Sequence, residues 1–222
     1  SENLMKETVL GLKMSGLKKP IYEIIGYKLQ PYSVYDEKYE LFQTKYVSPI
    51  SEKGLIDYDF QLLDTLKIGA HKSYLIYFKK KINKNGLEGV LYIDENSLAI
   101  TKAILQIQGV INIKATHEFD YIASEKLWFP TYNEVKIVKG KNDDPIKILG
   151  GTIYFEGEND EIGKQRKKEV SDITYVLSKT HFYDLTFSSE LPIVNKSYSI
   201  EINEDALKKE DGFWKTNSKE PL

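Results

Sequence analysis

The sequence contains no cysteine among its 222 residues. This absence excludes disulfide bonds, a thiolate nucleophile, a cysteine-ligated zinc site and an iron–sulfur cluster. Arginine is almost missing as well, because Arg166 is the only one. Arginine supplies the rigid fork that clamps phosphate and reads guanine, so its scarcity, together with a formal net charge of −2, argues against a nucleic acid partner.

The sequence also lacks long apolar runs and flexible linkers. No stretch reaches the roughly 18 consecutive apolar residues of a membrane-spanning helix, and no internal repeat or proline-rich segment divides the chain. With 41% hydrophobic and 29% charged residues, the chain is apolar enough to bury a core. We expect one β-rich domain over residues 1–203, followed by a short helix and a polar tail over residues 204–222.

The first thirty residues predict a small helical lid. Asn3 suits the N-cap of a first helix that ends at Gly16, and Pro20 suits the first turn of a second helix over residues 21–29. From Lys38 onward, apolar and polar side chains alternate with a period of 2, and we assign residues 31–203 to a curved antiparallel sheet. The predicted strands cover residues 38–47, 55–64, 72–80, 87–94, 97–108, 111–122, 127–138, 146–156, 168–177, 180–187 and 197–203.

Short polar turns separate several of these strands, and such turns join antiparallel neighbours. The strand at 111–122 has one apolar and one polar face, whereas the strand at 72–80 is apolar on both faces. Both faces of that strand therefore need cover. We predict a mainly β fold, with a strongly curved antiparallel sheet or incomplete β-barrel and a short N-terminal helical lid. A two-layer sandwich is the alternative.

Sixteen tyrosines, many of them on strands, are suited to a groove that stacks on sugars or holds an apolar ligand, because the amphipathic ring fits either. Ordinary core packing explains the same side chains. The candidate ligand-binding residues, all on three strands with apolar faces, are Tyr74, Ile76, Phe78, Leu105, Ile107, His117, Phe119 and Tyr121.

No pattern in the sequence predicts a catalytic site, a metal site or a cofactor. The three histidines are far apart, and His117, on the apolar face of its strand, is better explained as a hydrogen-bonded core residue than as a catalytic base. Asp57 and Asp59 alternate with aromatic residues, so they share a strand face, and we interpret them as its solvated side. Gly150 and Gly151 mark a bulge or a sharp bend.

Several segments resemble an uncharacterised family of Bacteroidota outer-membrane proteins, whose members carry a carboxypeptidase-like regulatory domain, a middle periplasmic region and a C-terminal barrel. The resemblance lies in residues 32–36 (YSVYD), 46–50 (YVSPI), 58–65 (YDFQLLDT), 89–94 (GVLYID), 127–130 (LWFP), 211–214 (DGFW) and 220–222 (EPL). It implies that the chain is the middle region, periplasmic and associated with the outer membrane.

The segment from residue 89 to residue 130 also looks like the periplasmic lipoprotein-carrier fold, an incomplete barrel lidded by helices that shelters acyl chains. This resemblance implies a non-enzymatic module that binds a lipid or a lipoprotein segment. The second hypothesis is an interaction domain that docks a partner protein or its own barrel, through the loop at 159–168 and the C-terminal tail. The third is a hydrolase that uses Asp57, Asp59 or His117.

Overall fold

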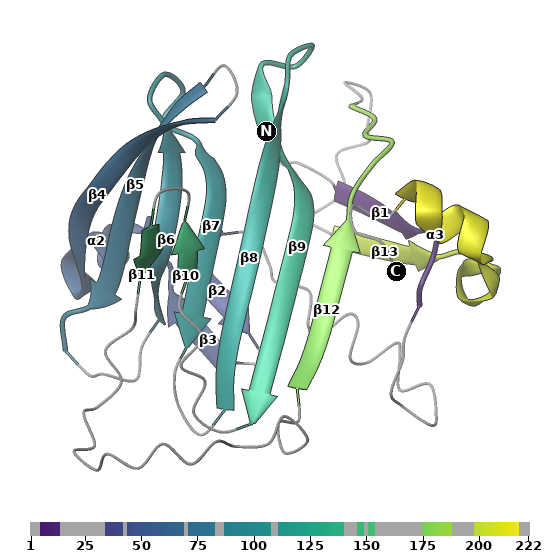
Figure 1. Ribbon diagram of the computed structural model, residues 1–222, viewed down its shortest axis with the longest axis horizontal. Coiled ribbons are helices and arrows are strands. Elements are labelled where there is room, and N and C mark those ends of the chain that lie inside the picture. The colour runs from purple at the N-terminus through teal and green to yellow at the C-terminus, as the bar shows by residue number, and fades with distance from the viewer. Residues whose placement is uncertain are drawn as a thin grey trace. The chain divides into compact units, whose positions relative to one another are not determined.

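The computed structural model describes residues 5–13, 34–41, 44–68, 71–82, 87–107, 111–139, 146–148, 151–153, 175–187 and 198–217. The fold is mainly β, as predicted. Its main element is a seven-stranded antiparallel sheet in the order β12-β9-β8-β7-β6-β5-β4 (Figure 1). Its strands are β4 (Tyr58–Ile68), β5 (His71–Lys80), β6 (Leu87–Asp94), β7 (Ile100–Ile107), β8 (Ile111–Ile122), β9 (Leu127–Lys139) and β12 (Tyr175–His181).

Consecutive strands from β4 to β9 pair as neighbours, which confirms the predicted antiparallel order. The register shifts at three places, between Leu62 and Asp64, at the end of β6, and between Glu118 and Phe119. Such bulges increase the local twist of a sheet. The sheet is open, because its two ends are β12 and β4 and it does not close into a barrel.

Strong curvature follows from one ring contact. The rings of His71 on β5 and Trp128 on β9 lie 4.9 Å apart, although β6, β7 and β8 separate their strands. In a flat sheet these strands would lie about 19 Å apart, since neighbours are spaced by about 4.8 Å. The sheet therefore curls at this end.

One face of the sheet carries the larger hydrophobic core. Phe78, Gly89, Leu105, Ala115 and Val135 pair in register and form a row across five strands of this face. The cluster also contains residues from outside the sheet. Its buried members are Val34, Tyr39, Tyr58, Phe78, Leu87, Leu91, Ile100, Ala103, Leu105, Ile107, Ile113, Ala115, Phe119 and Val135.

The opposite face carries a second, smaller core of Leu75, Val90, Tyr92 and Ile104. Leu75 and Phe78 are both 0% exposed, yet they belong to different clusters. This confirms that the strand predicted at 72–80 is apolar and covered on both faces.

A hairpin and a short helix precede the sheet in sequence. The strand predicted at 38–47 is instead the antiparallel pair β2 (Lys38–Leu41) and β3 (Thr44–Val47). The strand predicted to begin at residue 55 begins instead at Tyr58. Residues 55–57 belong to the helix α2 (Glu52–Asp57). Ser51 caps this helix, because its Oγ accepts a hydrogen bond from the Gly54 N–H at 3.0 Å.

The later strands are shorter than predicted. Two short antiparallel strands, β10 (Ile146–Ile148) and β11 (Gly151–Ile153), replace the first part of the strand predicted at 146–156. Residues 154–174, which include most of the strand predicted at 168–177, lie outside the described residues. β12 ends at His181, so the prediction of a strand over 180–187 is wrong beyond that residue.

The chain divides into two compact units, Ile24–Thr180 and a second unit of Ser1–Glu23 with His181–Leu222. The single domain over 1–203 stays a prediction. The second unit contains β1 (Met5–Val9) paired in parallel with β13 (Tyr198–Ile202), the 3-10 turn η2 (Ala206–Lys208) and the helix α3 (Asp211–Asn217).

The prediction of a first N-terminal helix is wrong over Met5–Val9. These residues form the strand β1, which pairs with β13 from the far end of the chain. The second predicted helix, at 21–29, lies outside the described residues. None of the described helices is both long enough and apolar enough to cross a bilayer.

Candidate functional site

Most of the predicted ligand-binding residues lie in the filled core. Phe78, Leu105, Ile107, His117 and Phe119 are between 0% and 8% exposed. Their neighbours are other side chains of the same cluster. The middle of this face is thus occupied by the protein's own side chains.

The cover of this face comes from the β2–β3 hairpin and the residues on either side of it. Val34 and Tyr39 are buried in the larger core, and Tyr46 and Val47 pack against it. The Tyr58 hydroxyl donates a hydrogen bond to the Val47 carbonyl at 2.8 Å, which holds the hairpin to the start of β4. The hairpin and the residues beside it therefore cover this face of the sheet.

His117 is a buried, hydrogen-bonded histidine, as the sequence indicated. Its Nε2 lies 2.9 Å from the Tyr39 hydroxyl and its Nδ1 lies 2.9 Å from Oδ1 of Asn133. Because an amide oxygen only accepts, Nδ1 carries the proton and Nε2 accepts from Tyr39. Burial lowers the pKa of His117 to about 4, against a smaller opposing effect of the Asn133 hydrogen bond. The ring is neutral and joins the hairpin to the sheet.

The other three predicted residues are less buried. Tyr74 and Ile76 are half-buried on β5, and the Tyr74 hydroxyl donates to Glu95 at 3.0 Å. Tyr121 is 39% exposed near the end of β8. The structure therefore separates the eight residues into a core group and a peripheral group.

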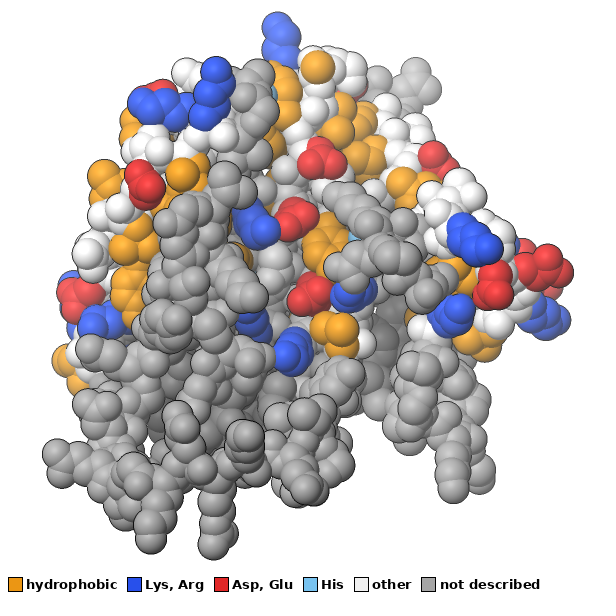
Figure 2. Space-filling view, viewed as in Figure 1, with side chains coloured by type: hydrophobic (Ala, Val, Ile, Leu, Met, Phe, Trp, Pro, Cys, Tyr) orange, Lys and Arg blue, Asp and Glu red, His pale blue; other side chains and the backbone are white. Residues whose placement is uncertain are grey.

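An apolar strip that the sequence analysis did not select continues the core face to the edge of the sheet. Phe60 and Leu62 on β4 pair directly with Phe78 and Ile76 on β5, yet Phe60 is 40% and Leu62 is 60% exposed. Figure 2 shows hydrophobic side chains along the side of the molecule where β4 lies. The alternation of residues 58–62 (YDFQL) was the sequence signal for this strip.

The helix α2, which directly precedes β4 in the chain, adds two exposed apolar side chains. Leu55 is 64% exposed and Ile56 is 71% exposed. The Ile56 carbonyl accepts a hydrogen bond from Lys81 Nζ at 2.7 Å, which ties α2 to the end of β5. Large exposed apolar side chains that gather in one region are typical of a binding surface.

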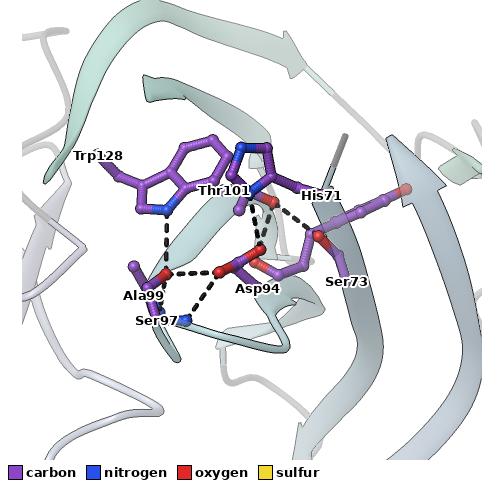
Figure 3. A network of polar contacts seen from close by, with 8 residues as sticks. His71, Ser73, Asp94, Ser97, Ala99, Thr101 and Trp128 are labelled. Atoms are coloured by element: carbon purple, nitrogen blue, oxygen red, sulfur yellow. Dashed lines mark hydrogen bonds and ion pairs between the residues drawn. The ribbon is translucent and has the colours of Figure 1, made fainter. Parts of the chain in front are cut away.

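A polar network lies at the other end of β5 (Figure 3). The Asp94 side chain is only 2% exposed, and its Oδ2 accepts hydrogen bonds from Ser97 N at 2.8 Å and Ser97 Oγ at 2.7 Å. His71 Nδ1 lies 3.2 Å from Asp94 Oδ1. Burial alone would raise the pKa of Asp94, but the hydrogen bonds from Ser97 and His71 outweigh it and hold that pKa below its usual value.

The network does not have the order of a Ser-His-Asp triad. In a triad the histidine accepts the proton of the serine, whereas here the Ser97 hydroxyl donates to Asp94. Ser97 Oγ in turn accepts a hydrogen bond from Trp128 Nε1 at 3.1 Å. We interpret the network as one that fixes the turn between β6 and β7.

The described residues provide no arrangement that supports a hydrolase or a metal site. Asp57 ends α2 and Asp59 lies in β4 opposite Lys79, so the prediction that the two carboxylates share a strand face is wrong. Over the described part of the chain, no group of three or more histidine and acidic side chains is arranged to hold a metal ion.

Comparison with known proteins identifies one family. The model described as "Family of unknown function (DUF5686)" matches residues 1–141. No curated protein and no solved structure matches the chain.

Proposed function

The chain belongs to this DUF5686 family of unknown function, and we propose that it is a non-enzymatic module that binds an apolar ligand on its curved sheet. The ligand is a lipid or a lipoprotein segment. The observation that carries the proposal is the exposed strip of Phe60 and Leu62, which continues a filled apolar core out to the edge strand β4. An acyl chain on this strip extends the existing core outward.

The strip has the chemistry of a site for an apolar chain. Half-buried Ile76 forms its inner side, and Phe60 stacks near Phe78 with ring centroids 6.3 Å apart. Covering Leu62 would remove apolar surface from water, which contributes about 25 cal/mol per Å². The ligand therefore lies at the margin of the core and not in its centre, where the predicted residues Leu105 and Ile107 are already packed.

The compartment in this proposal comes from the resemblance described above. Segments such as residues 58–65 and 89–94 resemble Bacteroidota outer-membrane proteins with a periplasmic middle region. We propose that this module is periplasmic and associated with the outer membrane. In that setting, acylated lipids and lipoproteins are the available apolar ligands.

Binding of a fluorescent fatty acid, 11-dansylaminoundecanoic acid, tests the proposal. We expect saturable binding by the unmodified chain. Leu62→Gln should weaken it about tenfold, because the lost apolar contact is worth about 1.5 kcal/mol. Leu207→Gln is the matched control, since Leu207 in η2 is also 60% exposed.

Two results would contradict the proposal. The first is no saturable binding by the unmodified chain. The second is an equal loss in both variants, which would indicate non-specific adsorption to exposed leucines. Native mass spectrometry of chain purified from bacterial envelopes should also detect a lipid that Leu62→Gln retains less.

The second candidate function is docking of a partner protein or of the chain's own membrane barrel. The exposed Leu55 and Ile56 of α2 favour it, because a one-and-a-half-turn helix with two exposed aliphatic side chains suits a protein contact. Fatty acid binding that Leu55→Gln weakens as strongly as Leu62→Gln would place both residues in one site. If Leu55→Gln leaves fatty acid binding unchanged, α2 lies outside the ligand site and is available for a partner protein.

A further inference from the structure

Three aromatic rings from three strands meet at the curled end of the sheet. His71 on β5 lies 4.9 Å from the Trp128 ring and 5.2 Å from the Tyr121 ring, measured between centroids. Tyr121 and Trp128 are paired across the β8–β9 ladder, and their rings are 5.5 Å apart. Since β6 and β7 lie between β5 and β8 in the sheet, these contacts join parts of the sheet that a flat sheet would separate.

The same histidine contacts a buried carboxylate. His71 Nδ1 lies 3.2 Å from Asp94 Oδ1, and the Asp94 side chain is 2% exposed whereas His71 is 31% exposed. Asp94 is held by Ser97, and Trp128 donates a hydrogen bond to that Ser97. Figure 3 shows His71 and Trp128 together above Asp94 and Ser97. Both rings are therefore anchored to the turn between β6 and β7.

We propose that His71, Tyr121 and Trp128 form a proton-controlled clasp that holds the curled end of the sheet, and that protonation of His71 tightens it. An imidazolium interacts with a carboxylate more strongly than a neutral imidazole does. An imidazolium is also attracted to the faces of indole and phenol rings more strongly than a neutral imidazole is. The clasp is independent of the ligand site on β4.

Two carboxylates, a lysine and a tyrosine lie around His71 at this end of the sheet. Asp94 faces it directly, and Glu95 follows Asp94 and bonds through its N–H to the Lys72 carbonyl. Lys72, beside His71 on β5, pairs with Glu95 at 2.7 Å, and Tyr121 faces the histidine from β8. Among these side-chain types, histidine is the one that normally changes charge between pH 5 and pH 8.

Hydrogen exchange of residues 121–128, reported as protection factors, tests the clasp in the full chain. We expect protection in this segment to be about fivefold higher at pH 5.5 than at pH 8. His71→Gln keeps a hydrogen-bond donor without a titratable charge, so its protection should not rise between pH 8 and pH 5.5. Asp94→Asn keeps an acceptor for Ser97 but removes the carboxylate charge, and most of the rise should disappear.

His181→Gln is the matched control, because His181 is half-buried and lies outside the clasp. It should retain the fivefold rise. The lowered pKa of buried His117 predicts a less stable fold on acidification, so a global effect would lower the protection at pH 5.5. Equal protection at both pH values, lower protection at pH 5.5, or an undiminished rise in His71→Gln would each overturn the proposal.

Discussion

At the scale of single residues, His117 shows what a sequence pattern does and does not reveal. Its place on the apolar face of an alternating strand predicted a buried, hydrogen-bonded ring, and the structure confirms this. Its partner Tyr39 comes from a hairpin 78 residues earlier, which no local pattern indicates. The neutral state of the ring then follows from burial and from the two hydrogen bonds.

The lowered pKa of His117 predicts acid sensitivity of the fold. The unfolded chain takes up a proton near pH 6.5 and the folded chain only near pH 4, so the unfolded state binds more protons between these values. The free energy of unfolding should fall by about 3 kcal/mol from pH 7 to pH 4 because of this residue. Urea unfolding at pH 7, 5.5 and 4 measures it.

Glu88 and Asp94 also contribute to the pH dependence of the free energy of unfolding. Burial raises the pKa of Glu88, so its contribution has the opposite sign and is lost as the pH rises through its folded value. The pKa of Asp94 is lowered, so this residue reduces the free energy of unfolding only as the pH falls below the usual range of an aspartate. His117→Gln should therefore flatten the slope between pH 6.5 and pH 4 even if it lowers stability at pH 7. An unchanged slope would contradict the assignment.

At the scale of elements, the backbone of β7 lies very close to β6 at Gly89. A Cβ atom added at Gly89 would lie 2.0 Å from the Ile104 carbonyl oxygen of β7. Because this oxygen belongs to the backbone, no side-chain rotation can remove the clash. Gly89 also lies between Phe78 and Leu105 in the core row. Glycine here allows two strands to approach closely while the core stays filled.

We expect Gly89→Ala to lower the free energy of unfolding by more than about 2 kcal/mol, because the strands must separate to admit the methyl group. Gly212→Ala in α3 is the matched control. A Cβ atom there has nothing within 4 Å, so this change should be neutral or stabilise by up to about 1 kcal/mol. Denaturant unfolding of both variants decides it, and similar small effects would contradict the close approach.

Elements were predictable where their cause is local. The strands from β5 to β9 follow the period-2 pattern closely, because each has a continuous apolar face to bury. The errors lie where the cause is distant or brief. β1 is a strand only because β13 pairs with it from the other end of the chain, and α2 depends on one capping serine.

At the scale of the whole molecule, the two-faced strand at 72–80 predicted a curved and covered sheet, and this holds. The nature of the cover was not predictable, because the β2–β3 hairpin looked like one strand. That hairpin explains why Phe78, Leu105 and His117 are core residues. The exposed strip of Phe60 and Leu62 was missed because alternation alone does not show which end of an apolar face stays uncovered.

The distribution of the core also predicts that residues 24–180 fold without the rest of the chain. The buried members of both hydrophobic clusters lie between Val34 and Val135, so this segment contains all of them. We expect cooperative urea unfolding, with the acid sensitivity of His117 retained. A segment of residues 58–180 is the informative control, because it removes Val34, Tyr39 and the β2–β3 hairpin and leaves Nε2 of His117 without its donor.

The shorter segment should be less stable by several kcal/mol, since a buried unpaired nitrogen costs about 1–3 kcal/mol and the uncovered core face adds to that loss. Near-ultraviolet circular dichroism of the two segments, compared with that of the full chain, reports whether the aromatic packing around Tyr58 and Phe78 is kept. If residues 24–180 give no cooperative transition, the sheet depends on residues outside this unit. Equal stability of both segments would instead show that the hairpin contributes little to the core.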